Sequence, residues 1–206
     1  MIYLSKVSHE AGGIGQEGFP FNLTFVQNLK VEFNTPVTYL VGENGSGKST
    51  FLESLGCVLK LPVVGSQALH TDPNLAAQKS LGRSYTLEWN ARTKWGFFLR
   101  AEDFFGFTKK LQETNREMEQ AAKEFESELS GYALQLAKGT VLGQKAANEA
   151  RYGKNPDARS HGESFLHLFQ QRIVPQGLYI LDEPEAPLSP QRQLSLLTMI
   201  NSSEML

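Results

Sequence analysis

The sequence predicts an α/β fold with an antiparallel β-subdomain at its N-terminus and an inserted helical subdomain, on three observations. An apolar run at 37–41 enters a glycine-rich loop and then an apolar-faced helix. A second apolar run, 177–182, ends in acidic residues. Between the two runs, residues 103–130 are polar, with apolar residues at helical spacing. The predicted order is therefore strands, glycine loop, strands, a helical insertion, and a return to the αβ core.

The glycine-rich loop carries the most specific motif of the chain. Residues 42–49 fit G-x-x-x-x-G-K-[ST] at every position. Glycines let backbone N–H groups approach phosphate oxygens, and the following helix adds partial positive charge at its N-terminus. Lys48 is expected to reach the β- and γ-phosphates, and Ser49 to give its hydroxyl to Mg²⁺. The alternative is a chance match in a glycine-bearing turn, against which the flanking strand and helix argue. The residues expected to bind nucleotide here are Gly42, Glu43, Asn44, Gly45, Ser46, Gly47, Lys48, Ser49 and Thr50.

Composition bounds the class of protein. The chain has 206 residues, 40% of them hydrophobic and 20% charged, with a net charge of −2. These values fit an ordinary globular domain and do not indicate a strongly basic nucleic-acid surface, although a local patch is compatible with a neutral total. The single cysteine, Cys57, is expected to be a core residue rather than a nucleophile. No opening signal peptide or apolar run of about 20 residues is visible, so a cytoplasmic protein without a membrane segment is expected.

Taken in order, the chain is expected to form a single domain, residues 1–206, in three parts. Strands are expected at 2–8, twice within 20–34, and at 84–90 and 94–100, the last two as a hairpin. Helices are expected at 103–130, 160–173 and 189–201, with a glycine-punctuated stretch after Gly131. The first part, 1–102, holds the β-subdomain and the phosphate loop. The second, 103–175, is the helical insertion, and the third, 176–206, is the half with the acidic strand.

The acidic pair completes the predicted site. Leu178–Leu181 is an apolar strand that leads into Asp182 and Glu183. In an open α/β sheet, ligands bind at the carboxyl ends of the strands. Asp182 is therefore expected to hold Mg²⁺ alongside Ser49, and Glu183 to orient or deprotonate the attacking water. The alternative is a buried strand whose acids only mark its solvent end.

Together these motifs resemble those of the ABC-type ATPases. The resemblance rests on the loop at 42–50, the helical insertion, and the segment Leu181-Asp182-Glu183-Pro184-Glu185-Ala186-Pro187-Leu188-Ser189-Pro190, and it covers essentially the whole chain. It is closest to the soluble branch of AAA-family ATPases related to the heads of structural-maintenance-of-chromosomes and DNA-repair proteins. The resemblance implies an ATPase with ATP and Mg²⁺ as cofactors. It also implies an ATP-dependent head-to-tail homodimer that drives a protein partner or DNA.

The same family has a signature loop that completes the γ-phosphate site of the partner subunit. Ser160-His161-Gly162-Glu163-Ser164 occupies that place, and by the family pattern Ser160 and Gly162 carry over. His161 and Glu163 differ in type from the transporter form. Ser-x-x-Glu before an apolar helix is also a capping box, and the two interpretations are compatible because a capped helix N-terminus also attracts anions.

Three expected family features are missing or ambiguous. No glutamine follows the strand at 94–100, so Arg100 or Glu102 is expected to replace it as a sensor of nucleotide or metal. The switch histidine is expected beyond Leu206, which makes the third part of the domain appear truncated. Candidate aromatic residues for stacking on adenine are Phe19, Phe21 and Tyr3, all of which also suit a core.

Three other functions remain open at this stage. An ATPase subunit of a membrane transporter is disfavoured by the atypical signature and the missing glutamine, and would be recognised by a membrane-embedded partner. A small-molecule kinase is disfavoured because Asp182 and Glu183 favour attack by water. A nucleotide-controlled interaction module with little turnover would be recognised by negligible phosphate release.

Overall fold

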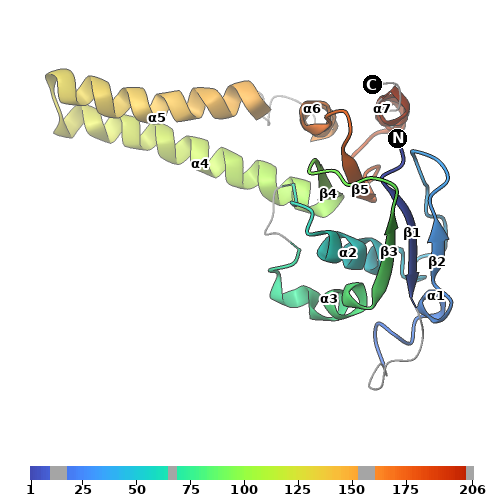
Figure 1. The fold of residues 1–206 in the computed structure, drawn as a ribbon. Helices are drawn as coiled ribbons and strands as arrows, with labels where there is room; N and C mark the ends of the chain where they lie inside the picture. Colours follow the sequence, from blue (N-terminus) through green and yellow to red (C-terminus); the bar gives the residue numbers. More distant parts are fainter. Residues whose placement is uncertain (10–17, 65–68, 153–160, 203–206) are drawn as a thin grey trace.

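The computed structural model describes residues 1–9, 18–64, 69–152 and 161–202. Figure 1 shows an α/β body from which two long antiparallel helices project side by side. These are α4 (Ala101–Glu128) and α5 (Gly131–Tyr152), called the helical hairpin below. The mixed α/β class predicted from the sequence is confirmed.

An antiparallel sheet forms one side of the body. It contains β1 (Leu4–His9), β2 (Lys30–Glu32) and β3 (Tyr85–Trp89) in the order β2-β1-β3. Two short strands were expected within 20–34, but Thr24–Gln27 forms one helical turn, α1, and only β2 is a strand. The turn is stabilised because it buries Val26, whose N–H donates to Leu23 O at 2.9 Å.

A parallel sheet forms the centre of the body. It pairs β4 (Gly96–Arg100) with β5 (Leu178–Asp182), and Val63 makes an isolated parallel bridge to Phe98 in β4. The expected hairpin between 84–90 and 94–100 is therefore wrong. β3 pairs with β1 and β4 pairs with β5, so the two strands belong to different sheets. Gly96 permits the β4–β5 contact, since an added Cβ would lie 1.9 Å from Leu178 O.

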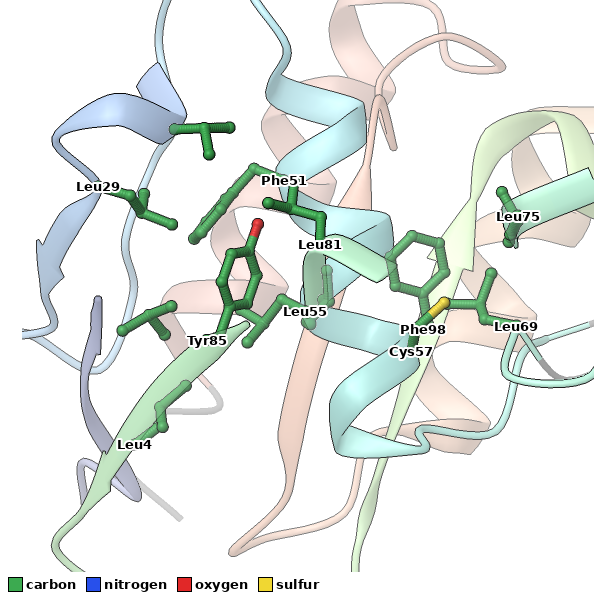
Figure 2. Packing of buried hydrophobic residues seen from close by; sticks show 13 residues of the cluster. Leu4, Leu29, Phe51, Leu55, Cys57, Leu69, Leu75, Leu81, Tyr85 and Phe98 are labelled. Atoms are coloured by element: carbon green, nitrogen blue, oxygen red, sulfur yellow. The ribbon is translucent and has the colours of Figure 1, made fainter. Parts of the chain in front are cut away.

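Helices cover both faces of this central sheet. Phe98 and Ile180 face a cluster with α2 (Lys48–Leu59), shown in Figure 2. Phe97 and Leu99 face a second cluster with α6 (His161–Arg172) and α7 (Pro190–Ser202). Side chains alternate across a strand, and a parallel strand buried on both faces is mostly apolar, as β4 is from Phe97 to Leu99. A short 3₁₀ turn (Pro73–Leu75) leads into α3 (Ala76–Arg83), which packs on α2.

The helical hairpin was only half expected. The helix predicted over 103–130 is present as α4, and the glycine-punctuated stretch after Gly131, for which no element was predicted, is the long helix α5. Each interior glycine of α5 weakens the helix by about 1 kcal/mol relative to alanine. Packing against α4 offsets this cost, with ion pairs from Lys145 to Glu119 at 2.5 Å and from Lys138 to Glu126.

The strand expected at 37–41 is also absent. Within the described residues this segment has no strand assignment, and Val41 and Tyr39 are 93% and 59% exposed. A strand requires a neighbour whose backbone groups pair with its own. Among the described residues the ladder of β5 runs to β4, and no ladder joins 37–41 to the other edge of β5.

Candidate functional site

The phosphate loop lies directly before α2. Gly45 and Gly47 have φ of +81° and +95°, a region that favours glycine. Lys48, the first residue of the helix, donates through Nζ to Gly42 O at 2.7 Å and to Glu43 O at 2.9 Å. The loop therefore curls around the lysine ammonium, and residues 42–46 are exposed. This arrangement presents an accessible cation and a helix N-terminus at the same point.

The N-terminus of α2 is open to an anion. Its N-cap, Gly47, has no side chain with which to cap the first turn. The first N–H groups of a helix lack intrahelical partners and carry partial positive charge. Gly47 is also required sterically, because a Cβ at this position would lie 2.4 Å from Phe25 Cε1. The sequence did not indicate that Phe25 lies under the loop, and its alternation with Phe21 and Leu23 was the only available signal.

Ser49 and Asp182 meet across the body. Ser49 Oγ, in the first turn of α2, donates to Asp182 Oδ1 at 3.2 Å, at the carboxyl end of β5. Asp182 is 9% exposed. These two residues come from segments far apart in the sequence, and the structure brings them together as the predicted Mg²⁺ site requires.

The donor set fits Mg²⁺. A hydroxyl and a carboxylate supply hard oxygen ligands, and Mg²⁺ in nucleotide sites usually takes one or two protein oxygens together with phosphates and waters. No group of three or more His, Cys, Asp or Glu side chains suited to a metal occurs among the residues that the structure describes. Ser49 and Asp182 would therefore hold the ion only together with the phosphates of a nucleotide.

Glu183 follows Asp182 at the end of the strand. Its side chain is exposed and its φ is +48°, in the left-handed region that a non-glycine residue rarely adopts. The turn is held by Ala186 N–H, which donates to Glu183 O at 3.0 Å. Strained backbone of this kind often occurs at functional sites. The turn directs the chain away from the strand immediately after the acidic pair.

The predicted signature segment is only partly described. Ser160 lies outside the described residues. Gly162 is buried in the first turn of α6, where an added Cβ would lie 3.0 Å from Arg192 Cδ and 3.3 Å from Pro187 O. Arg192 Nη2 pairs with Glu163 Oε1 at 2.6 Å. The carboxylate expected to complete a capping box thus contacts α7, and nothing in the sequence indicated the role of Arg192.

The sensor and adenine candidates are spread over the body. Arg100, at the end of β4, pairs with Glu53 of α2, and the side chain of Glu102 lies outside the described residues. Tyr3 lies beside Asn90, whose N–H donates to its carbonyl, at the end of β1 remote from His9. The other two candidates are Phe21, which packs 6.1 Å from the His9 ring, and Phe19, which is 58% exposed.

Two buried titratable side chains behind the loop stay protonated at neutral pH. Burial raises the pKa of the Cys57 thiol to about 11, so the thiol stays protonated at neutral pH. Burial likewise raises the pKa of Tyr85, whose ring packs 6.1 Å from that of Phe51 in α2 (Figure 2). Both belong to the core that supports the phosphate loop, and Cys57 is the core residue that the sequence predicted.

A comparison with known protein families matches residues 20–149 to a family described as an AAA domain. The match spans more than half of the chain, which therefore belongs to the AAA domain family of P-loop ATPase-like proteins. It includes the phosphate loop and most of the helical hairpin and ends before β5. No curated protein and no solved structure matches the chain. Among the described helices, none is long and apolar enough to cross a membrane.

Proposed function

We propose that this chain is a Mg²⁺-dependent ATP hydrolase that works as a homodimer with ATP between its subunits. The observation that carries the hydrolase is the contact of Ser49 with Asp182 beside a phosphate loop that holds a partly exposed lysine. A phosphate loop alone binds nucleotide. Asp182, at the carboxyl end of β5, adds a carboxylate beside the loop. This carboxylate gives the site a place for the Mg²⁺ ion that ATP hydrolysis uses.

Each residue has a separate task in this proposal. Lys48 leaves its contacts with Gly42 and Glu43 oxygens and binds the β- and γ-phosphates, while loop N–H groups donate to the same oxygens. Ser49 and Asp182 hold the metal, which when bound offsets negative charge on the phosphates. Glu183 accepts a proton from the attacking water, since its exposed carboxylate follows directly after the metal ligand.

Phosphate release from ATP tests the hydrolase. We expect turnover that requires Mg²⁺ and that falls by about 10²–10⁴ in Glu183→Gln, because the variant keeps the shape and removes the base. ATP binding should persist in that variant. Asp182→Ala should lose most of its turnover, while its melting temperature changes little. Turnover that is indifferent to a chelator would contradict the metal assignment. Normal ATP binding with negligible turnover in the unaltered protein would instead favour a nucleotide-controlled interaction module.

The homodimer rests on the signature segment of the family that the sequence resembles. Supporting it, Gly162 lies in the first turn of α6, and the N-terminus of a helix attracts anions. We expect Glu183→Gln to be monomeric without nucleotide and dimeric with Mg-ATP in a sizing experiment. Adding Ser160→Arg should abolish that dimer and leave binding by each subunit's own loop. A Glu183→Gln protein that stays monomeric at saturating ATP would refute the shared site.

The process driven by this cycle is expected to involve a protein partner or DNA, on the same resemblance. ATP turnover measured with and without DNA tests this part, with an increase expected if DNA is the partner. An unchanged rate would direct attention to a protein partner.

A further inference from the structure

A second contact joins α2 to the central sheet, one helical turn from Ser49. Glu53 lies four positions after Ser49, on the same face of α2. Its Oε1 lies 3.1 Å from Arg100 Nη2, and both side chains are 13% exposed. Arg100 ends β4, in register with Asp182, which ends β5. The contacts Ser49–Asp182 and Glu53–Arg100 therefore both join α2 to the central sheet, the first at the end of β5 and the second at the end of β4.

The Glu53–Arg100 pair is held from several sides. Gln78 of α3 donates through Nε2 to Glu53 Oε2 at 2.9 Å. The guanidinium of Arg100 lies 5.5 Å from the centroid of the Phe98 ring, two residues earlier on the same face of β4. An ion pair with this little exposure is screened less by solvent than a pair at the surface.

We propose that Glu53 and Arg100 are a positioning pair that sets the distance between Ser49 and Asp182 and thereby the affinity for Mg²⁺. The inference rests on the proposed function, because it concerns the same metal site. It assigns Arg100 a task different from direct contact with nucleotide. Arg100 acts by fixing the distance between α2 and the sheet, because its guanidinium contacts Glu53 of α2.

The physical reason is the strict coordination geometry of Mg²⁺. The ion requires near-ideal octahedral ligands at about 2.0–2.1 Å, so a small change in the separation of two ligands alters its binding. Residues that hold metal ligands in place typically change metal affinity by about 10–100-fold when they are replaced. Loss of one ionic contact beside the site should therefore reduce metal affinity and leave phosphate binding through Lys48 in place.

The test uses Mn²⁺, which also prefers oxygen ligands, and measures its binding to the full chain with ATP by electron paramagnetic resonance. The variant is Glu53→Gln with Arg100→Met, which removes the ionic contact and leaves no isolated buried charge. We expect Mn²⁺ to bind about 10-fold or more weakly, while ATP affinity without metal changes less than about twofold. Arg100→Lys in a chain that keeps Glu53 retains the charge, and its Mn²⁺ affinity should lie between those of the double variant and the unaltered protein.

The matched control is Lys6→Met with Glu88→Gln. This removes another ion pair, the exposed pair between β1 and β3, and should leave Mn²⁺ affinity unchanged. If the unaltered protein binds no Mn²⁺ with ATP, the proposed function fails. If it binds Mn²⁺ and the Glu53–Arg100 variant binds equally well, the positioning role is wrong. Should the double variant not fold, Glu53→Asp keeps both charges but shortens the side chain and draws the carboxylate away from Arg100. Unchanged Mn²⁺ affinity in that variant overturns the inference.

Discussion

The α/β body and the helical hairpin are held together by different forces. In the body, Phe98 and Phe165 are fully buried in two clusters on opposite faces of the central sheet. The hairpin buries Ala101 and Phe104 where it joins the body, but Ala122 is the only buried side chain among those described between 106 and 150. Its helices are joined instead by partly exposed ion pairs such as Lys145–Glu119. Because the candidate site lies entirely in the body, its geometry depends on apolar burial, and the hairpin can change with little effect on it.

The largest expected effect is loss of a buried ring in the body. Phe165 is fully buried and packs edge-on against Phe104, with ring centroids 5.0 Å apart. Phe165→Ala should lower the free energy of unfolding by about 3–5 kcal/mol, because the cavity adds to the lost burial. Urea denaturation measures the change. Tyr132→Ala in the hairpin, where the side chain is 79% exposed, is the control and should stay within about 0.5 kcal/mol. Similar losses in both variants would remove the contrast between the two regions.

Glycine-to-alanine substitutions should change the stability of the protein in opposite directions in the two regions. At Gly82 in α3, an added Cβ would lie 2.5 Å from Ser54 O in α2, so Gly82→Ala should destabilise the protein by about 1–3 kcal/mol. At Gly139 in α5, no atom lies within 4 Å of an added Cβ, and alanine should stabilise the helix by up to about 1 kcal/mol. Thermal unfolding of both variants checks the signs. Two destabilised variants would mean that the outer face of α5 is covered.

The smallest expected effect is a loss of local stability in the hairpin at low pH or at high salt. The contact with Lys145 lowers the pKa of Glu119 from its ordinary value of 4.5. A carboxylate with a lowered pKa stabilises the folded state above that ordinary value, and the stabilisation is lost as the pH falls through the lower folded value. Hydrogen exchange in α4 and α5 should therefore become faster below about pH 4, relative to β4 and β5. Glu119→Gln should remove part of this pH dependence.

Salt provides an independent check on the same ion pairs. At about 1 M salt the Debye length falls to about 3 Å, which weakens exposed pairs such as Lys138–Glu126 but leaves apolar burial in place. We expect faster exchange in the hairpin with unchanged exchange in the body. Equal protection of the hairpin at low and high salt would contradict a role for these pairs.

Two apolar runs show how far the sequence predicts the fold. Residues 37–41 and 178–182 have similar patterns, and each leads into a motif of the candidate site. The second run forms β5 because β4 lies beside it in register, whereas the first pairs with no strand among the described residues. Local pattern identifies the tendency to form a strand, and the available neighbour decides the outcome. The same limit explains why β3 and β4, adjacent in sequence, belong to different sheets.

The candidate site was more predictable where one segment supplies both the motif and its geometry. The loop at 42–49 contains its own glycines, lysine and helix start, and the expected nearness of Ser49 to Asp182 followed from the rule for strand ends. Contacts between distant segments had no comparable signal. The pairing of Glu163 with Arg192 depends on how α6 packs against α7, and that of Glu53 with Arg100 depends on how α2 packs against β4.

Equilibrium binding of ATP to the unaltered protein and to Lys48→Ala tests the central assignment most directly. The account predicts that the unaltered protein binds Mg-ATP and that Lys48→Ala loses at least about 30-fold in affinity, since a charge-assisted contact with phosphate is removed. Its fold should persist because the hydrogen bonds that the Lys48 ammonium makes in the described structure go to oxygens of its own loop. Lys94→Ala, which removes an exposed lysine near the start of β4, is the control and should bind as the unaltered protein does. Equal affinity for ATP in Lys48→Ala and in the unaltered protein would contradict the assignment of residues 42–49 as the phosphate-binding loop.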